Sequence, residues 1–162
     1  MRPLFLEQAF RMRSCAQSVA ELLPHGPPMV LLDEVLGWDQ GVVSTALTIR
    51  PGIPFFVHGK GIPAHVGLEY MAQACGVYAG IEGLNHGRPV RLGFLLGTRN
   101  YRASVDWFPL GRRLVIDAKE IFRQDLMGAF DCRISDAGGE CASAQLNLYQ
   151  PDDVSSVLKG LG

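Results

Sequence analysis

Residues 65–84 read HVGLEYMAQACGVYAGIEGL and predict the one long helix of the chain. Apolar or small side chains occupy nearly its whole circumference, which is typical of a helix that is enclosed on most sides. Several of the small residues are glycines, and each glycine costs a helix about 1 kcal/mol relative to alanine. We therefore expect tight packing to offset that cost, with a sheet lying close to the helix backbone.

Strand patterns flank this helix on both sides. Before it, residues 29–36 are dense in valine and leucine, and residues 43–49 alternate at the two-residue period of a strand. After it, residues 130–134 and 142–148 alternate around an Asp-Ala-Gly-Gly turn at 136–139, which predicts a hairpin with one buried face. A further strand is expected to place four apolar side chains on one face: Leu114, Ile116, Ala118 and Phe122. Strands around one buried helix predict an α+β domain whose sheet wraps that helix.

The length and composition indicate an ordinary globular protein. The 162 residues suffice for about one domain, and 48% of them are hydrophobic while 19% are charged. A net charge of −1 gives no strong attraction to nucleic acid or to an anionic membrane. We expect a single domain over residues 1–162, with a core at about 18–150 and a polar tail at 151–162.

The sequence favours a cytoplasmic location. Charged residues interrupt the apolar N-terminal segment, so that segment does not resemble a signal peptide. No apolar run approaches the roughly 18 residues needed to span a bilayer. The four cysteines show no CxxC spacing, and without an export signal we expect reduced thiols that mostly fill the core.

Basic residues gather between Arg88 and Arg113, where Asp106 is the only acidic residue. Two interpretations stay open. The segment is either a solvated edge of the sheet or a landing surface for an acidic carrier protein or a phosphate group.

Glu69 is the anomalous residue of the predicted helix. Its neighbours at helical spacing include Ala72, Gln73 and Gly76, and none of them is a cation. Glutamate is rarely buried without a partner, and burial would raise its pKa toward neutrality. Such a carboxyl group is suited to donate a proton as a general acid. The alternative is a solvated glutamate that the helix dipole favours in the first turn.

The segment 50–64 is rich in proline and glycine and also carries Phe55, Phe56 and His58. Surface linkers seldom need consecutive aromatic residues, so we expect this loop to pack against another part of the structure. A lone histidine such as His58, His65 or His25 is more often a structural residue than a catalytic one. The four histidines show no metal-ligand pattern, and no GxSxG, GxxxxGKS/T or GxGxxG motif is present. We expect neither a metal ion nor a cofactor.

Three segments resemble the FabZ-type 3-hydroxyacyl-ACP dehydratases. Residues 22–35, LLPHGPPMVLLDEV, resemble the N-terminal signature of that family, and residues 63–73, PAHVGLEYMAQ, resemble the block that begins its central helix. Phe108-Pro-Leu-Gly111, followed by a β-rich run, resembles a turn of the family. The resemblance extends over about residues 18–150, and the first two motifs in this order are fairly specific together.

The resemblance implies a hot-dog fold, an antiparallel sheet wrapped around one long helix, with an active site shared across a dimer interface. By position, Glu69 matches the catalytic acid, His58 is the candidate for the histidine, and the backbone amide near Ala64 matches the donor that polarises the thioester carbonyl. The implied reaction is dehydration of a 3-hydroxyacyl thioester, on acyl carrier protein or coenzyme A, to the trans-2-enoyl thioester. The residues expected to line the substrate site are Ala64, His65, Gly67, Gln73, Phe55 and Phe56.

The chain departs from the FabZ pattern at two points. The loop after the histidine is His58-Gly-Lys-Gly-Ile-Pro63, and Ala64 stands where the family has glycine, so His65 is an alternative base. The shortened loop and the block Gly67-Leu-Glu-Tyr-Met-Ala-Gln73 resemble the dehydratase-like proteins of aryl-polyene and similar polyketide pathways, some of which form one half of a heterodimer. A homodimer and a heterodimer both remain open. Two other functions also do: a hot-dog thioesterase in which Glu69 activates water, and a non-catalytic partner subunit.

Overall fold

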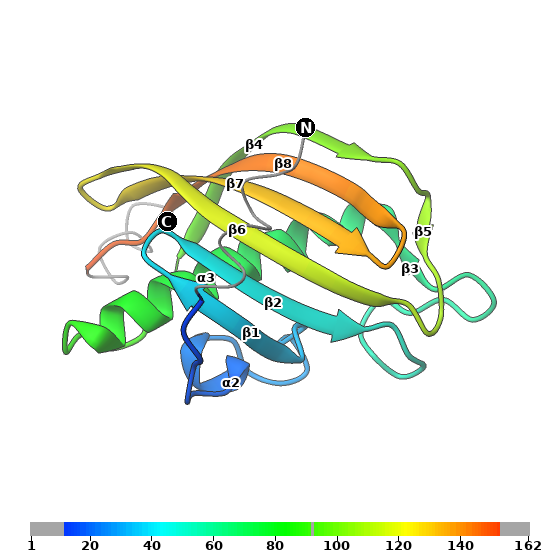
Figure 1. Cartoon of the computed structure of the whole chain (residues 1–162), viewed down its shortest axis with the longest axis horizontal. Coiled ribbons are helices and arrows are strands. Elements are labelled where there is room, and N and C mark those ends of the chain that lie inside the picture. The colour runs from blue at the N-terminus through cyan, green and yellow to red at the C-terminus, as the bar shows by residue number, and fades with distance from the viewer. Residues whose placement is uncertain (1–11, 92, 153–162) are drawn as a thin grey trace, which may run out of the picture.

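The computed structural model describes residues 12–91 and 93–152 and contains one long helix partly enclosed by a sheet (Figure 1). The predicted tail at 151–162 therefore lies almost entirely outside the described residues. In chain order the elements are α2 (Val19–Leu22), β1 (Glu34–Asp39), β2 (Val42–Thr48), β3 (Ile62–Pro63), the 3-10 helix η1 (Ala64–Val66), α3 (Gly67–Asn85), β4 (Phe94–Ala103), β5 (Trp107–Phe108), β6 (Arg113–Gln124), β7 (Met127–Asp136) and β8 (Gly139–Tyr149).

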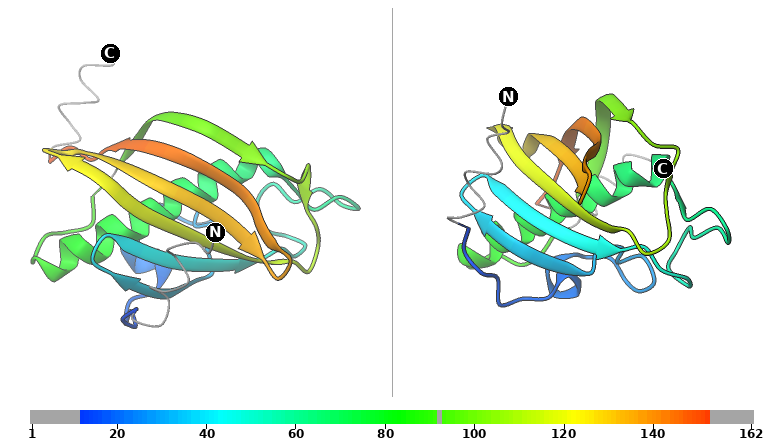
Figure 2. Two further views of the ribbon diagram at one scale, coloured as in Figure 1. Left: turned by 45° about the horizontal axis from the view of Figure 1, so that its top comes forward. Right: turned by 45° about the vertical axis from the view of Figure 1, so that its right-hand side comes forward.

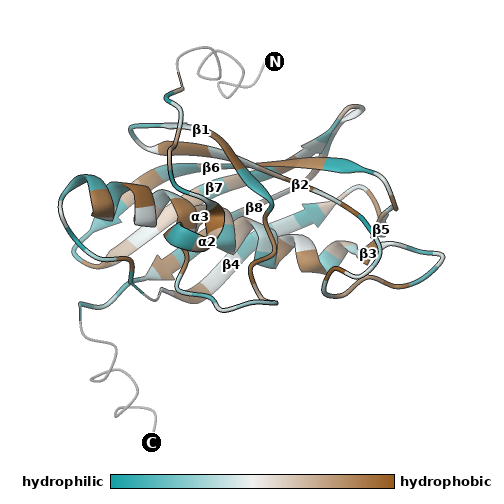
Figure 3. Cartoon of the chain, turned by 90° about the horizontal axis from the view of Figure 1, so that it is seen from below, coloured by the Kyte–Doolittle hydropathy of each residue, from teal (hydrophilic) through white to brown (hydrophobic). Residues whose placement is uncertain are grey.

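Six strands form one antiparallel sheet in the order β1-β2-β6-β7-β8-β4. The sheet curves around α3, as the two turned views in Figure 2 show. Hydrophobic residues are spread along α3 and the strands around it (Figure 3), and the buried core consists mainly of side chains from these elements. The predicted α+β class and the hot-dog arrangement are confirmed.

The glycines of α3 lie where neighbouring segments approach the helix backbone. A Cβ atom on Gly67 would lie 2.7 Å from the Tyr101 hydroxyl and 2.9 Å from Ile134 Cδ1 of the sheet. A Cβ atom on Gly80 would instead overlap the backbone of Leu22 in α2. The close approach that the sequence predicts is thus present, but the sheet makes it only at the start of α3, and α2 makes it farther along.

Two strand predictions are wrong in detail. Residues 29–33 are not in a strand, because the Gln73 side chain takes up backbone groups there: its Nε2 donates to the Met29 carbonyl oxygen at 2.7 Å and its Oε1 accepts from the Leu31 N–H at 2.9 Å. Phe122 is 54% exposed and does not share the buried face of Leu114. The β6–β7 register shifts between Glu120 and Phe122, and such a bulge reverses the alternation of side chains beyond it.

The loop before α3 ends in a small two-stranded sheet. β3 pairs with β5, and the Ala64 N–H extends this pairing by donating to the Asp106 carbonyl oxygen at 2.9 Å. Gly61 has φ +102°, and a Cβ atom there would overlap the Phe108 carbonyl oxygen. This sheet therefore fixes the point at which the chain enters α3. No helix among the described residues is long and apolar enough to cross a membrane.

Candidate active site

Glu69 lies in the first turn of α3 and is partly buried. Gln73, one turn later, donates a hydrogen bond from Nε2 to Glu69 Oε1 at 3.3 Å. The Gln73 side chain is 1% exposed and is held by the backbone of Met29 and Leu31. Gln73 thus orients the Glu69 carboxyl group from a fixed position, and its amide is already engaged within the chain.

Glu69 has no lysine or arginine at helical spacing in the sequence, and the described part of the structure gives it no such partner either. Within residues 12–91 and 93–152, no lysine or arginine forms an ion pair with Glu69. This environment is compatible with a general acid.

Glu69 lines a cavity of about 220 Å³ that extends along α3. On the helix side, the wall consists largely of small residues at helical spacing: Ala72, Gly76, Ala79 and Gly83. Apolar side chains from the sheet form part of the opposite wall: Leu95, Phe130 and Leu148. The lining also includes charged side chains near the end of α3: Glu82, Arg88, Arg91, Glu120 and Arg123. The small and apolar part of this lining suits an apolar chain.

His58 does not lie in this cavity. It is an exposed residue in the turn that the Val57–Gly61 bridge closes, and His65 in η1 is exposed as well. Within the described chain, neither of the two predicted bases therefore lines the cavity that Glu69 lines.

The histidine that lines the Glu69 cavity is His25. Its Nδ1 atom is buried and has no hydrogen-bond partner within the described residues. The segment that carries it runs along α3, since Leu23 approaches Gly76 while Met29 and Leu31 bind Gln73. Sequence reasoning gave His25 no role, because spacing alone does not show that this turn lies beside the helix.

The aromatic loop is only partly packed. Phe56 packs against the core, whereas Phe55 has φ +70° and is 49% exposed. The Lys60 ammonium group lies 5.2 Å from the centroid of the Trp107 ring, which ties the tip of the loop to β5. The predicted packing of this loop therefore holds for Phe56 within the chain and not for Phe55.

The positions near Ala64 show which backbone donors are already used. The Ala64 N–H is taken by Asp106, and the Ala64 carbonyl oxygen accepts a hydrogen bond from the Tyr101 hydroxyl. Gly67 is buried beside Tyr101 and Ile134. The first N–H groups of a helix have no partner inside the helix, so the donors for a bound carbonyl oxygen are expected just after Ala64.

Part of the chain has relatives among the dehydratases. It is similar to FabZ, a 3-hydroxyacyl-[acyl-carrier-protein] dehydratase, from Chlamydia trachomatis serovar L2, with 37% identity over 87 residues that cover 50% of this chain and 56% of the relative. FabZ from Anaeromyxobacter sp. (strain Fw109-5) is 38% identical over 68 residues, which cover 39% of this chain and 43% of the relative. The chain thus spans about half the length of the curated relatives it matches.

The solved structures point to the same fold. A chain of the dehydratase heterocomplex ApeI:P from Xenorhabdus doucetiae superposes with a TM-score of 0.85 and 31% identity, covering 91% of this chain and 99% of that one. The Escherichia coli PaaI protein superposes with a TM-score of 0.57 at 11% identity, covering 73% of this chain and 78% of that one, and this shows the fold alone. The family described as ApeP-like, the ApeP dehydratase, matches residues 17–159. The chain therefore belongs to the ApeP-like dehydratase family.

Proposed function

We propose that this protein dehydrates a 3-hydroxyacyl thioester to the trans-2-enoyl thioester, with Glu69 as the general acid. The observation that carries the proposal is the position of Glu69, a partly buried carboxyl group on a cavity whose wall includes many small and apolar residues, with charged side chains near the end of α3. Membership of the ApeP-like family supports the same reaction. The thioester would be carried on acyl carrier protein or coenzyme A, in fatty acid or polyketide (aryl-polyene-type) synthesis.

The chemistry divides between a base and an acid. A histidine removes the proton from C2, which the thioester carbonyl acidifies, and N–H groups at the start of the helix stabilise the enolate-like oxygen. Glu69 then protonates the hydroxyl group on C3, the C3–O bond breaks, and water leaves as the double bond forms between C2 and C3. Gln73 keeps the Glu69 carboxyl group aimed at that hydroxyl.

The base belongs to a second hot-dog subunit in this proposal. His58 is exposed on a loop that also exposes Phe55 and Val57, and such a surface is suited to be covered by a partner. The similarity to a chain of the ApeI:P heterocomplex supports a heterodimer, and a homodimer would provide the same crossed arrangement. His58 is the proposed base and His65 the alternative.

One observation favours a second candidate function. His58 does not line the Glu69 cavity within the described chain, and the Ala64 N–H already donates to Asp106, so this chain could instead complete the site of a catalytic partner. In that case the reaction would survive when His58 or Glu69 of this chain is substituted.

The test uses purified wild-type protein, Glu69→Gln and His58→Ala, each alone and with a second hot-dog dehydratase subunit. Product formation from 3-hydroxyacyl-ACP is followed by mass spectrometry. Loss of one water in the wild type, abolished by both substitutions, supports the proposal, while release of a free acid would replace it with thioester hydrolysis. His86→Ala serves as the matched control, because His86 is an exposed histidine at the other end of α3.

Mixing the two inactive variants tests the shared site directly. If the site combines Glu69 of one copy with His58 of another, random re-assembly of Glu69→Gln and His58→Ala restores about a quarter of wild-type activity, since half the dimers are mixed and each has one intact site. No recovery, in a mixture shown to exchange subunits, would contradict a site shared between copies of this chain.

A further inference from the structure

The cavity that begins at Glu69 follows one side of α3 toward its C-terminal end. The helix residues that line it include Glu69, Ala72, Gly76, Ala79 and Gly83, spaced alternately by three and four residues. Residues at this spacing share one face of a helix. With a rise of 1.5 Å per residue, the path from Glu69 to Gly83 is about 21 Å long.

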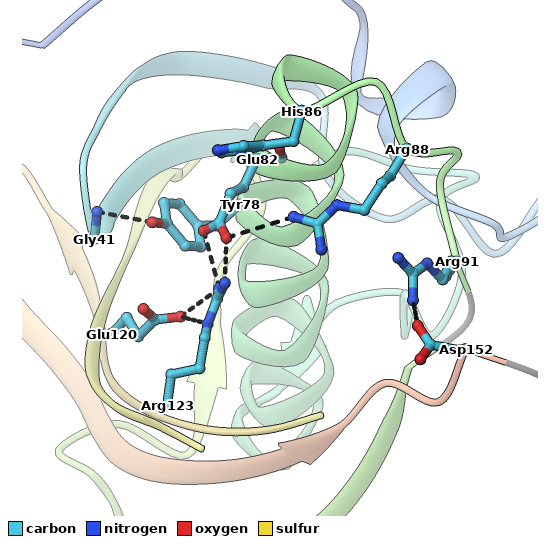
Figure 4. Close-up of polar contacts among 9 residues, drawn as sticks. All are labelled: Gly41, Tyr78, Glu82, His86, Arg88, Arg91, Glu120, Arg123 and Asp152. Carbon is cyan, nitrogen blue, oxygen red and sulfur yellow. Dashed lines mark hydrogen bonds and ion pairs between the residues drawn. The ribbon is translucent and has the colours of Figure 1, made fainter. Parts of the chain in front are cut away.

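A network of ion pairs lies at the far end of this path. The Arg123 guanidinium group binds both carboxylate oxygens of Glu82, through Nη1 and, at 2.9 Å, through Nη2. The same group binds Glu120 Oε2 from Nε at 3.0 Å and from Nη2 at 2.7 Å. Figure 4 shows the three side chains bridging from α3 to β6, with Arg88 on the other side of Glu82 at 3.9 Å.

Glu82 and Arg123 are both charged at neutral pH. Burial alone would raise the pKa of Glu82, but hydrogen bonds and charge from Arg123 lower that pKa below its usual value. The two carboxylates likewise raise the pKa of Arg123 despite its partial burial. The far end of the cavity is therefore charged, whereas its middle is lined by small and apolar side chains.

We propose that the Glu82–Arg123–Glu120 network is the stop that limits the length of the acyl chain. An apolar chain end that reaches the network would strip water from charged groups and offer no hydrogen bond in return, which is unfavourable. This inference rests on the proposed function, because it takes the occupant of the cavity to be the acyl chain of the thioester. It assigns chain-length selectivity to residues remote from Glu69.

The helix gives the scale of the limit. Three bonds of a fully extended backbone span at most about 3.6 Å, or roughly 1.2 Å per bond, and an extended acyl chain advances similarly. The path of about 21 Å is an upper bound on the length of the chain. The cavity volume of about 220 Å³ is the tighter bound. Since a cavity of about 150 Å³ holds the six carbons of benzene, this one holds roughly 8 to 10 carbon atoms.

The test compares two double variants. Glu82→Ala/Arg123→Ala removes one charge of each sign and opens the far end of the cavity. Glu34→Ala/Arg113→Ala is the matched control, because it removes an ion pair of 2.6 Å between β1 and β6 that does not line the cavity. If the first variant does not fold, Glu82→Gln/Arg123→Met removes the charges with less change in volume.

Binding is measured by calorimetry in a Glu69→Gln background, so that turnover does not interfere. The ligands are 3-hydroxyacyl-pantetheine thioesters of ~6–20 carbons, a range that brackets the expected limit. With an intact network, affinity should rise by roughly threefold to fourfold per methylene group and stop rising near the limit. Opening the network should move that limit by about two to four carbons, and the control should not move it.

If affinity depends on chain length identically in all variants, the network does not limit the length of the acyl chain. Failure to bind a thioester of any length would contradict the proposal as well. Turnover of the same series with Glu69 intact separates this result from the proposed reaction. Binding with a movable limit but no dehydration would refute the reaction and leave the stop supported.

Discussion

Gly80→Ala should destabilise the protein, although alanine is the better helix former. In the interior of α3 the exchange gains about 1 kcal/mol of intrinsic helix propensity. A Cβ atom on Gly80 would, however, overlap the Leu22 carbonyl oxygen and lie 3.2 Å from its carbonyl carbon. Those atoms are backbone and cannot rotate away, so α2 would have to shift as a unit.

The size of the effect follows from these two contributions. Overpacking of a well-filled site costs about 1–3 kcal/mol, and an overlap with backbone belongs at the upper end of that range. Less the propensity gain, we expect Gly80→Ala to lower the free energy of unfolding by about 2 kcal/mol. For a chain of this size that corresponds to a fall in Tm of about 4–8 °C.

Gly83→Ala, on the same helix, is the matched control. A Cβ atom on Gly83 would lie 3.7 Å from the Pro89 carbonyl oxygen, which is ordinary van der Waals contact. This exchange should therefore raise Tm by about 2–4 °C through propensity alone. Thermal unfolding followed by circular dichroism measures both variants, and a Tm for Gly80→Ala at or above wild type would refute the packing of α2 against α3.

Three further predictions concern stability. Gln73→Leu should lower the free energy of unfolding by about 2–4 kcal/mol in chemical denaturation, because it leaves two backbone groups of the preceding segment without a partner; an effect below about 1 kcal/mol would contradict this role. Gly61→Ala should cost about 3 kcal/mol or more, since Gly61 has φ +102° and faces the Phe108 carbonyl oxygen, whereas Gly97→Ala, with open space around it, should cost far less. Burial raises the pKa of Asp117 above its ordinary value of 3.8. The stability linked to the protonated form of Asp117 is therefore fully present below pH 3.8 and is lost as the pH rises through the folded-state pKa. Asp117→Asn should therefore stabilise the protein at pH 7 and lose this advantage at about pH 3, and a pH-independent difference between the two proteins would rule the explanation out.

The sequence predicts the fold well where local periodicity determines structure. The uniform apolar character of residues 65–84 indicates an enclosed helix, and α3 occupies Gly67–Asn85. The alternation around residues 136–139 indicates a hairpin, and β7 and β8 form it. These patterns depend on which faces of each element are buried, and short-range spacing records that directly.

Features that depend on distant contacts could not be predicted in this way. Residues 29–33 are apolar enough for a strand, but the side chain of Gln73, more than forty residues later, binds their backbone instead. The alternation along its strand would bury Phe122, but a bulge in the pairing with β7 reverses the alternation just before this residue. Both outcomes depend on the register of the tertiary structure.

The sequence likewise predicts one part of the candidate site and misses another. Glu69 stands out in the sequence because it is the one acidic residue in the first turns of an apolar helix, and the structure places it in a cavity. His25 enters that cavity through a turn whose path beside α3 has no local signal. His58 is exposed outside that cavity, so its proposed role as the base calls on a second subunit, which the single chain does not describe.

The central claim is that the Glu69 carboxyl group is the acid of a dehydration. Single-turnover rates of enoyl-ACP formation, for the wild type and for Glu69→Gln in the assembled dehydratase, test it most directly. Removing a general acid while keeping its shape should slow the reaction by about 10²–10⁴-fold, with no loss of folded protein in either sample. A Glu69→Gln rate within about tenfold of the wild type would contradict the claim and assign the proton transfer to another group.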